Sequence, residues 1–293
     1  MPIYYPDILD QKNAATTFSY TDKDVMLYAL GIGLGADPMD ERELAFVYEK
    51  NLKVVPTAVT VLPSANPLSV GPAPEMPPGH RPSQINYLMM LHGEQKVELL
   101  RPLPTSGTFT SSGGTIGAWD KGKEKGAVVS SQGVWTDEKG EVVVRSTTSL
   151  FARGDGGFGG PSEGQPEPPR PPSRAPDLSL DIPTRPDQAL IYRLNGDRNP
   201  LHSDPQTAKA AGFPRPILHG LCTYGITCRA VLQGILDYDS DAILSHQVRF
   251  SSPTFPGETI TVDMWKDGKN ISFEARVKAR DVTVVRNGLT VLR

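Results

Sequence analysis

One short pattern occurs twice in this chain and decides its architecture. Residues 184–196 read TRPDQALIYRLNG, and residues 21–31 read TDKDVMLYALG. Each begins with a threonine suited to cap a helix, continues with an acid in the first turn, and places Tyr and Leu on a short helix. Pro186 suits an early position of the second helix, where its missing N–H does no harm. We therefore predict a short capped helix in each half of the chain.

A second repeat follows further along each half. Residues 95–104 and 245–256 both alternate as strands do and then break at two prolines. A tryptophan and a Gly-Lys turn come next, in residues 119–123 and again in 265–269. Shared turn chemistry is the alternative explanation. Two similar units in tandem account for both repeats.

A proline-rich run separates the two units. Residues 161–176 read PSEGQPEPPRPPSRAP, a composition that cannot join a helix or a central strand and that extends as polyproline II. We expect an N-terminal domain at residues 1–155, a Pro/Gly-rich linker at 156–178 and a C-terminal domain at 179–293. A chain of 293 residues is long enough for two domains.

Both units show the same order of elements. Residues 217–232 are apolar nearly all round, which predicts a buried helix, and residues 85–91 take the equivalent place in the first unit. Residues 141–151 and 259–265 have the composition of strands. The expected fold class is α+β, with one buried helix wrapped by an antiparallel sheet in each unit.

Composition excludes several classes of protein. A net charge of −3 gives no basic face for nucleic acid, so we expect no nucleic-acid partner. No run of 18 apolar residues occurs, which predicts no membrane span, and residues 1–7 do not resemble a signal peptide. Cys222 and Cys228 cannot form a disulfide framework, suit a reducing compartment and are expected in the core.

Cofactor motifs are also weak. Residues 31–36 match a loose dinucleotide-binding pattern, but they follow a capped helix instead of a strand. The five histidines show no closely spaced pair, and the two cysteines lack the spacing of metal ligands. We expect neither a cofactor nor a metal.

The densest polar cluster is GDRNPLH at residues 196–202. Asp197 and His202 together can perform acid–base chemistry, because their ordinary pKa values lie on either side of the range just below neutrality. Asn199 can donate a hydrogen bond that orients Asp197. The alternative is an Asx turn, with His202 capping the next helix.

A histidine and a glycine, His219-Gly220, lie at the start of the predicted buried helix. The Gly220 N–H, at a helix N-terminus, can stabilise a developing oxyanion; the alternative is a plain tight entry into a buried helix. His92-Gly93 is the counterpart in the first unit. Lys121 belongs to a basic turn that is either a solvated face or a contact for a phosphorylated ligand.

The whole pattern now resembles a known family. Residues 192–205, 211–213 and 216–220 strongly resemble the hydratase 2 motif of the MaoC-like (R)-specific 2-enoyl-CoA hydratases, also called 3-hydroxyacyl-CoA dehydratases. Further segments resemble the N-terminal half of two-domain members, including the hydratase part of the peroxisomal multifunctional enzyme: residues 28–31, 55–57, 91–93, 120–122 and 156–160. The resemblance implies a double hot dog fold.

The resemblance also implies roles for single residues. Asp197 and His202 match the pair that activates water, Asn199 matches the residue that orients the Asp, and the Gly220 N–H matches the oxyanion donor. Acyl-CoA contacts are implied for His92, Gly93, Lys121 and Phe250. Glu49 matches a glutamate implicated in activity, for which we expect a structural role.

The implied activity is a lyase reaction, the reversible syn hydration of trans-2-enoyl-CoA to (R)-3-hydroxyacyl-CoA, without a cofactor. The alternatives are a hot dog acyl-CoA thioesterase and a non-catalytic acyl-CoA-binding subunit. The first unit lacks the Gly-Asp-x-Asn-Pro-x-His pattern, so we expect one active site per chain. The run at 62–82 is expected to replace a helix and leave room for a long acyl tail.

The resemblance leaves the pathway open, with fatty-acid β-oxidation among the candidates, and favours a homodimer. The final residues, LTVLR, differ from a peroxisomal Ser-Lys-Leu signal. We expect a bacterial cytoplasmic enzyme, or a peroxisomal matrix enzyme if the C-terminus is truncated.

Overall fold

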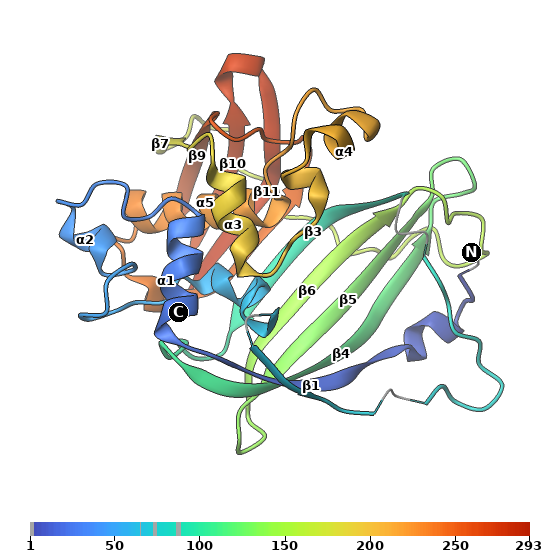
Figure 1. Cartoon of the computed structure of the whole chain (residues 1–293). Coiled ribbons are helices and arrows are strands. Elements are labelled where there is room, and N and C mark those ends of the chain that lie inside the picture. The colour runs from blue at the N-terminus through green and yellow to red at the C-terminus, as the bar shows by residue number, and fades with distance from the viewer. Residues whose placement is uncertain (1–2, 65, 73–74, 86–88) are drawn as a thin grey trace.

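A single antiparallel sheet organises the chain (Figure 1). The computed structural model describes residues 3–64, 66–72, 75–85 and 89–293. The strands of the first unit are β1 (Lys12–Tyr20), β2 (Asn66–Val70), β3 (Met90–Leu99), β4 (Gly107–Asp120), β5 (Ala127–Thr136) and β6 (Val142–Ala152). Those of the second are β7 (Leu178–Pro183), β8 (Ile243–Phe250), β9 (Thr259–Asp267), β10 (Asn270–Val277) and β11 (Val282–Leu292). Their order across the sheet is β2-β1-β4-β5-β6-β3-β8-β11-β10-β9-β7.

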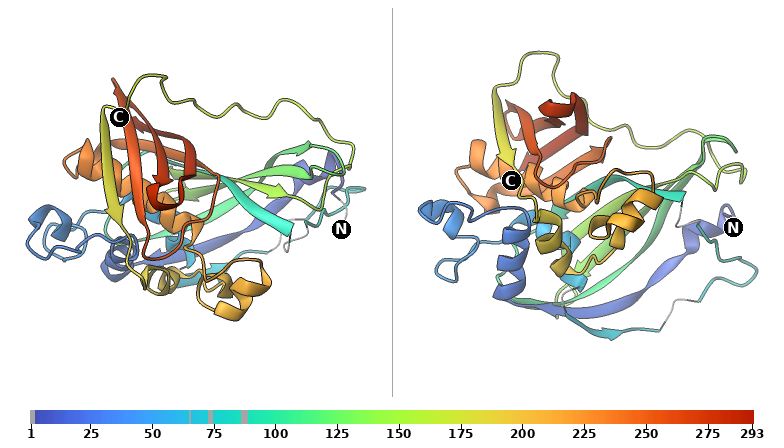
Figure 2. Two further views of the ribbon diagram at one scale, coloured as in Figure 1. Left: turned by 90° about the horizontal axis from the view of Figure 1, so that it is seen from above. Right: turned by 45° about the horizontal axis from the view of Figure 1, so that its top comes forward.

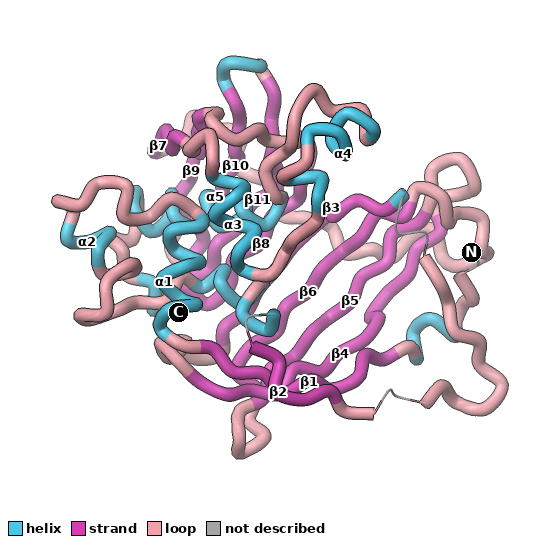
Figure 3. The backbone as a smooth tube through the Cα atoms, viewed as in Figure 1, coloured by secondary structure: helices cyan, strands magenta, loops and turns pink. Residues whose placement is uncertain are grey.

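Among the described residues the helices are few, and α5 is the longest of them. The α-helices are α1 (Asp22–Gly31), α2 (Glu41–Leu44), α3 (Gln188–Tyr192), α4 (Pro205–Ala210) and α5 (Gly220–Gly234). The 3₁₀ turns are η1 (Asp7–Asp10), η2 (Pro56–Thr60), η3 (Leu62–Ser64), η5 (Arg193–Asn195), η6 (Pro200–His202), η7 (Ser240–Ala242) and η8 (Lys278–Arg280). Figure 3 shows most of the helical segments gathered beside the second unit, while η1 lies next to β4 of the first; much of the first unit's strands is left uncovered.

The buried helix of the second unit is α5, as predicted. Every residue from Cys222 to Leu232 is buried, because the helix is apolar nearly all round, Arg229 being its charged exception. Both cysteines are free and lie in the core, which confirms their expected place. The α+β prediction is confirmed for this unit, where β7 and β8 to β11 enclose α5.

The first unit differs from the prediction. Met90 and Leu91, expected in a helix, begin strand β3 instead; residues 86–88 of that expected helix lie outside the described residues. The turn η2 packs in the helix's place, against α5, β3, β6 and β8. Part of the run 62–82 is also regular, because β2 pairs with β1 along the sheet edge.

Strands β3 and β8 join the two units. They pair from Glu94 with Arg249 to Glu98 with Ser245. Residues 153–177, all described, form no helix or strand, and Figure 2 shows them crossing one face of the sheet while α1, α3 and α4 lie on the other. The Asn287 side-chain amide donates a 2.6 Å hydrogen bond to the Pro169 carbonyl and so anchors this linker.

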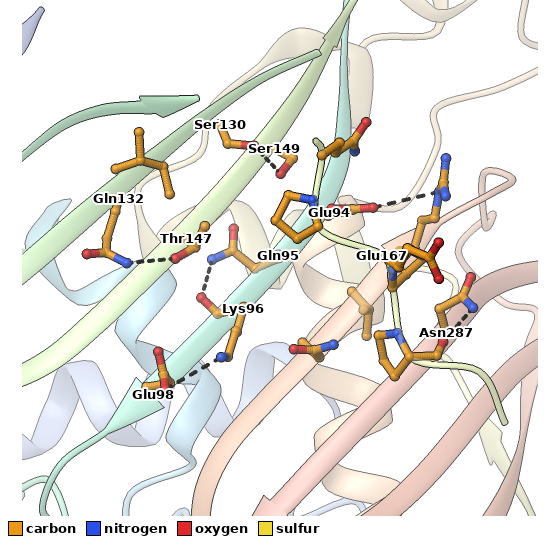
Figure 4. A pocket seen from close by; sticks show the side chains of 18 of the residues that line it. Glu94, Gln95, Lys96, Glu98, Ser130, Gln132, Thr147, Ser149, Glu167 and Asn287 are labelled. Atoms are coloured by element: carbon orange, nitrogen blue, oxygen red, sulfur yellow. Dashed lines mark hydrogen bonds and ion pairs between the residues drawn. The ribbon is translucent and has the colours of Figure 1, made fainter. Parts of the chain in front are cut away.

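The linker covers a polar pocket of about 310 Å³ on that face. Figure 4 shows that its labelled side chains are polar and come from β3, β5, β6, β11 and the linker. Glu94, Lys96 and Glu98 line it, and they alternate along β3 with Val97 and Leu99 of the core. We call this the outer face of the sheet and the opposite one the inner face.

One predicted helix cap is present and the other is wrong. The Asp24 carboxylate accepts a 2.8 Å hydrogen bond from the Thr21 N–H, which gives α1 the expected capping box. The second helix begins only at Gln188, after Asp187. The Thr184 hydroxyl donates to the Glu258 carbonyl at 2.7 Å instead, because the chain there still runs along the sheet edge.

A buried ion pair also crosses between the units, and the sequence analysis missed it. The Arg229 guanidinium on α5 lies 2.8 Å from the Glu43 carboxylate on α2, and both side chains are less than a tenth exposed. The Gly35 N–H donates to the second Glu43 oxygen at 2.8 Å. Glu49, for which a structural role was expected, lies exposed on the surface.

Candidate active site

The site begins in the loop after α3, where the backbone turns sharply. Gly196 has a φ of 119°, and an added Cβ would come within 2.8 Å of Ser64, so only glycine fits this turn. The Asn199 N–H then donates to an Asp197 carboxylate oxygen at 3.1 Å. The Asn199 side chain accepts from the Leu201 N–H at 3.0 Å. Asn199 thus orients Asp197 through its backbone, while its side chain caps η6.

His202 is held in one tautomer. Its Nδ1 lies 2.9 Å from the Ile217 carbonyl oxygen, which can only accept, so Nδ1 carries the proton and Nε2 keeps a lone pair. Burial lowers the pKa of His202, although the Ile217 carbonyl and the Asp197 charge oppose this. His202 is therefore neutral near pH 7 and able to accept a proton. It does not cap α4, since Asp204 does.

The structure brings together three groups that can bind protons. One ligand atom each from Asp197, His202 and His219 lies within 4.8 Å of the other two. Asp197 is exposed, whereas the two histidines are buried. The Asp197 carboxylate therefore lies on the solvent side of the cluster. As the spacing of five residues in the sequence predicted, Asp197 and His202 lie close together.

His219 is the member that sequence reasoning missed. Its ring stacks on His202 with 3.8 Å between centroids and 27° between planes. Its Nε2 donates to the Asp197 carbonyl at 3.2 Å, which ties the stack to the loop of residues 196–202. Burial, helped by the charge of His202, lowers the pKa of His219 to about 4. The sequence analysis assigned a role to the Gly220 N–H but none to His219.

These three residues do not suit a shared metal ion. An imidazole binds a metal through a lone pair in the plane of its ring. The rings of His202 and His219 are stacked, so their in-plane lone pairs run side by side and do not converge on one point. The cluster is suited to proton transfer.

Gly220 is the first residue of α5, and His219 precedes it at φ −56° and ψ 135°. The first N–H groups of a helix have no acceptor within the helix, and the helix dipole makes that end positive. A Cβ on Gly220 would lie 3.6 Å from the Phe250 ring, an ordinary contact. The Gly220 N–H is therefore placed to bind an anionic oxygen beside Phe250.

The first unit contributes residues at the point where the two units diverge. Pairing between β3 and β8 ends at Glu94 with Arg249, so His92 and Gly93 lie just beyond it. The His92 ring meets the Phe250 ring edge-on at 4.9 Å. Burial lowers the pKa of His92 to about 4, and its Nε2 donates to Gln95 at 3.1 Å. His92 and Phe250 are thus brought together beside Gly220.

Lys121 lies on a separate surface. It borders a hollow of about 730 Å³ whose rim also carries the basic side chains of Lys125, Arg153 and Arg249. Its ammonium donates to the Ser162 carbonyl at 2.9 Å. Arg249 lies on the outer face of β8, whereas Phe250, the next residue, packs against the core on the inner face, so the hollow and the ring beside Gly220 lie on opposite sides of the sheet where β3 and β8 diverge.

Comparison with known proteins agrees with this architecture. The MFE-2 hydratase 2 N-terminal domain family matches residues 18–154, and the MaoC like domain family matches residues 168–287. "Enoyl-CoA hydratase ChsH3" of Mycobacterium tuberculosis is 42% identical over 292 residues, which cover 100% of this chain and 99% of that protein. "Enoyl-CoA hydratase 2, peroxisomal" of Arabidopsis thaliana is 36% identical, covering 95% and 92%.

Solved structures support the fold. A MaoC-like dehydratase from Phytophthora capsici superposes with a TM-score of 0.86 at 37% identity and covers 99% of both chains. A Mycobacterium tuberculosis protein described as having a double hotdog fold gives a TM-score of 0.53 at 10% identity, a likeness of fold alone. No helix in the described ranges is long and apolar enough to span a membrane. The expected double hot dog fold is confirmed, and the chain belongs to the MaoC-like hydratase 2 family.

Proposed function

We propose that this protein is a hydro-lyase that reversibly hydrates trans-2-enoyl-CoA to (R)-3-hydroxyacyl-CoA. The observation that carries the proposal is the meeting of Asp197, a neutral His202 and the N-terminus of α5 in one place. The relatives named as enoyl-CoA hydratases match 100% and 95% of this chain, which supports the same chemistry.

Water is the nucleophile in this reaction. Asp197 and the free Nε2 of His202 bind one water molecule, and His202 takes a proton from it. The water oxygen then forms a bond to C3 of the enoyl thioester. The C2–C3 π electrons move toward the carbonyl, and the proton held by His202 passes to C2 on the same face. One water is consumed and the protein is unchanged.

Negative charge collects on the thioester oxygen during this addition. The Gly220 N–H, at the positive end of α5, donates a hydrogen bond to that oxygen. His92, Gly93 and Phe250 hold the thioester beside it, because they lie where the two units diverge. The basic hollow around Lys121 offers cations for the phosphates of CoA.

The first unit serves to bind substrate, with one active site in each chain. A cavity of about 290 Å³ runs from His92 and Leu221 along the inner face of the first unit. A long acyl tail would occupy it. This part of the proposal fails if the enzyme cannot hydrate substrates longer than about six carbons. The domain bounds, a homodimer and a bacterial cytoplasmic location stay predictions.

The test is a direct assay. The protein is incubated with crotonyl-CoA and with a longer enoyl-CoA, and loss of the conjugated thioester absorbance is followed together with release of free thiol. Absorbance should fall without thiol release, whereas thiol release would indicate a thioesterase. Asp197→Ala and His202→Ala should each lower turnover by roughly 10²–10⁴-fold. His80→Ala, which removes a surface histidine beside Asp10, is the matched control and should leave turnover unchanged.

A further inference from the structure

The cavity of the first unit has an unexpected lining. Apolar side chains of Val59, Pro63, Trp135 and Leu221 form part of its wall. The strands contribute mainly hydroxyl and amide groups to the rest: Asn13, Gln95, Ser111, Ser131, Ser146 and Thr148. A site for a plain alkyl chain would be lined predominantly by apolar side chains, with few polar groups.

This polar band lies between two apolar clusters on the same face. Toward one end of the strands, Leu99 and Trp135 belong to the main core, which η2 covers. Toward the other end, Val129 packs with Ile3 and Ile8 of the N-terminal segment in a second cluster. The band is therefore not simply the place where packing stops, because packed side chains resume beyond it.

Part of the band is already hydrogen-bonded and part is open. Gln95 is 3% exposed; its oxygen accepts from Thr148 at 2.9 Å and its amide donates to Ser146 at 3.0 Å. By contrast, the hydroxyls of Ser111 and Ser131 make no hydrogen bond to another described residue. Both line the cavity, so their hydrogen-bonding capacity is available to a ligand.

We infer that the cavity selects acyl groups that carry a hydroxyl or keto oxygen remote from the thioester. This inference rests on the proposed hydratase function. The acyl group would enter beside His92 on β3 and run across the strands. Neighbouring strands lie about 4.8 Å apart, so Ser131 on β5 is about 10 Å beyond β3 and Ser111 on β4 about 14 Å. An oxygen at that distance meets the open hydroxyls, while the carbon skeleton contacts Trp135 and Leu221.

A matched pair of substrates tests the inference. We would measure kcat/KM for trans-2-dodecenoyl-CoA and for its ω-hydroxy derivative, in the native protein and in the double variant Ser111→Ala/Ser131→Ala. The hydroxylated substrate should be favoured by about tenfold in the native protein, the effect of one to two hydrogen bonds. The double variant should lose most of this preference. The control Ser112→Ala removes an exposed hydroxyl from the opposite face of β4. This variant should keep the preference for the hydroxylated substrate.

Two outcomes would overturn the inference: equal or faster hydration of the plain chain, or an unchanged preference in the double variant. Crotonyl-CoA separates this result from the fate of the hydratase proposal, because its acyl group is too short to reach the band. Its hydration should be equal in all three proteins. Failure of the native protein to hydrate crotonyl-CoA would count against the hydratase function itself.

Discussion

Replacement of Gly220 by proline removes a single N–H group from the proposed site. Proline is well tolerated at the first position of a helix, and Gly220 is that position in α5. His219 already has the extended backbone, at φ −56° and ψ 135°, that a residue before proline prefers. The lost N–H has no acceptor within the helix, so the fold should keep its stability. Only the hydrogen bond to the thioester oxygen is removed.

The size of the effect follows from that role. Loss of one oxyanion donor lowers kcat by about 10²–10³-fold, or about 2.7–4 kcal/mol of transition-state stabilisation. Gly220→Ala keeps the N–H, and its Cβ would make an ordinary 3.6 Å contact with Phe250, so it should be at least tenfold faster than the proline variant. The assay is crotonyl-CoA hydration, with thermal unfolding followed by circular dichroism. Near-native kcat in a folded Gly220→Pro protein would refute the assignment of the donor.

Three further results are expected. Arg229→Met leaves the Glu43 carboxylate buried and unpaired, so it should lower the free energy of unfolding by about 3 kcal/mol and the melting temperature by about 6 °C. Adding Glu43→Leu should restore most of this stability. A double variant as unstable as the single one would contradict this expectation. Since burial lowers the pKa of His202, kcat/KM should fall with acidification only below its ordinary pKa of 6.5; loss of activity already above pH 7 would argue against His202 as the base. Burial lowers the pKa of His219 to about 4 and that of His246, a fully buried residue of β8, to about 3, so the unfolded chain binds more protons than the folded one below pH 6.5. Stability to urea should therefore fall between pH 6.5 and 4, by up to about 1.4 kcal/mol per pH unit for each histidine.

The sequence predicted best where one local rule was enough. Helix α5 follows from an apolar stretch long enough to exclude a strand, and the meeting of Asp197 with His202 follows from one short loop. The prediction of a helix at residues 85–91 was wrong for Met90 and Leu91, because a short apolar run fits a helix or a strand equally well. Met90 and Leu91 joined β3, where pairing with β6 satisfies their backbone groups.

Features that depend on distant partners could not be predicted. The Thr184 hydroxyl donates a hydrogen bond to the carbonyl of Glu258, 74 residues away, and no local pattern predicts this bond in place of a helix cap. The stack of His219 on His202 depends on how α5 docks beside the loop. Glu43 and Arg229 are separated by 186 residues, and although Arg229 lies within the predicted buried helix, no local pattern identifies Glu43 as its partner.

The pairing of β3 with β8 has a consequence for biosynthesis. β3 is flanked by β6 on one side, but its other side stays open until β8 leaves the ribosome. Residues 153–242 must be translated in between, which takes roughly 5–18 s at 5–20 residues per second. During that interval the nascent chain exposes an unpaired strand edge, the kind of surface on which chains aggregate. Slow translation or a late truncation should therefore harm this protein through aggregation of its first unit, even though the proposed catalytic residues lie in the second.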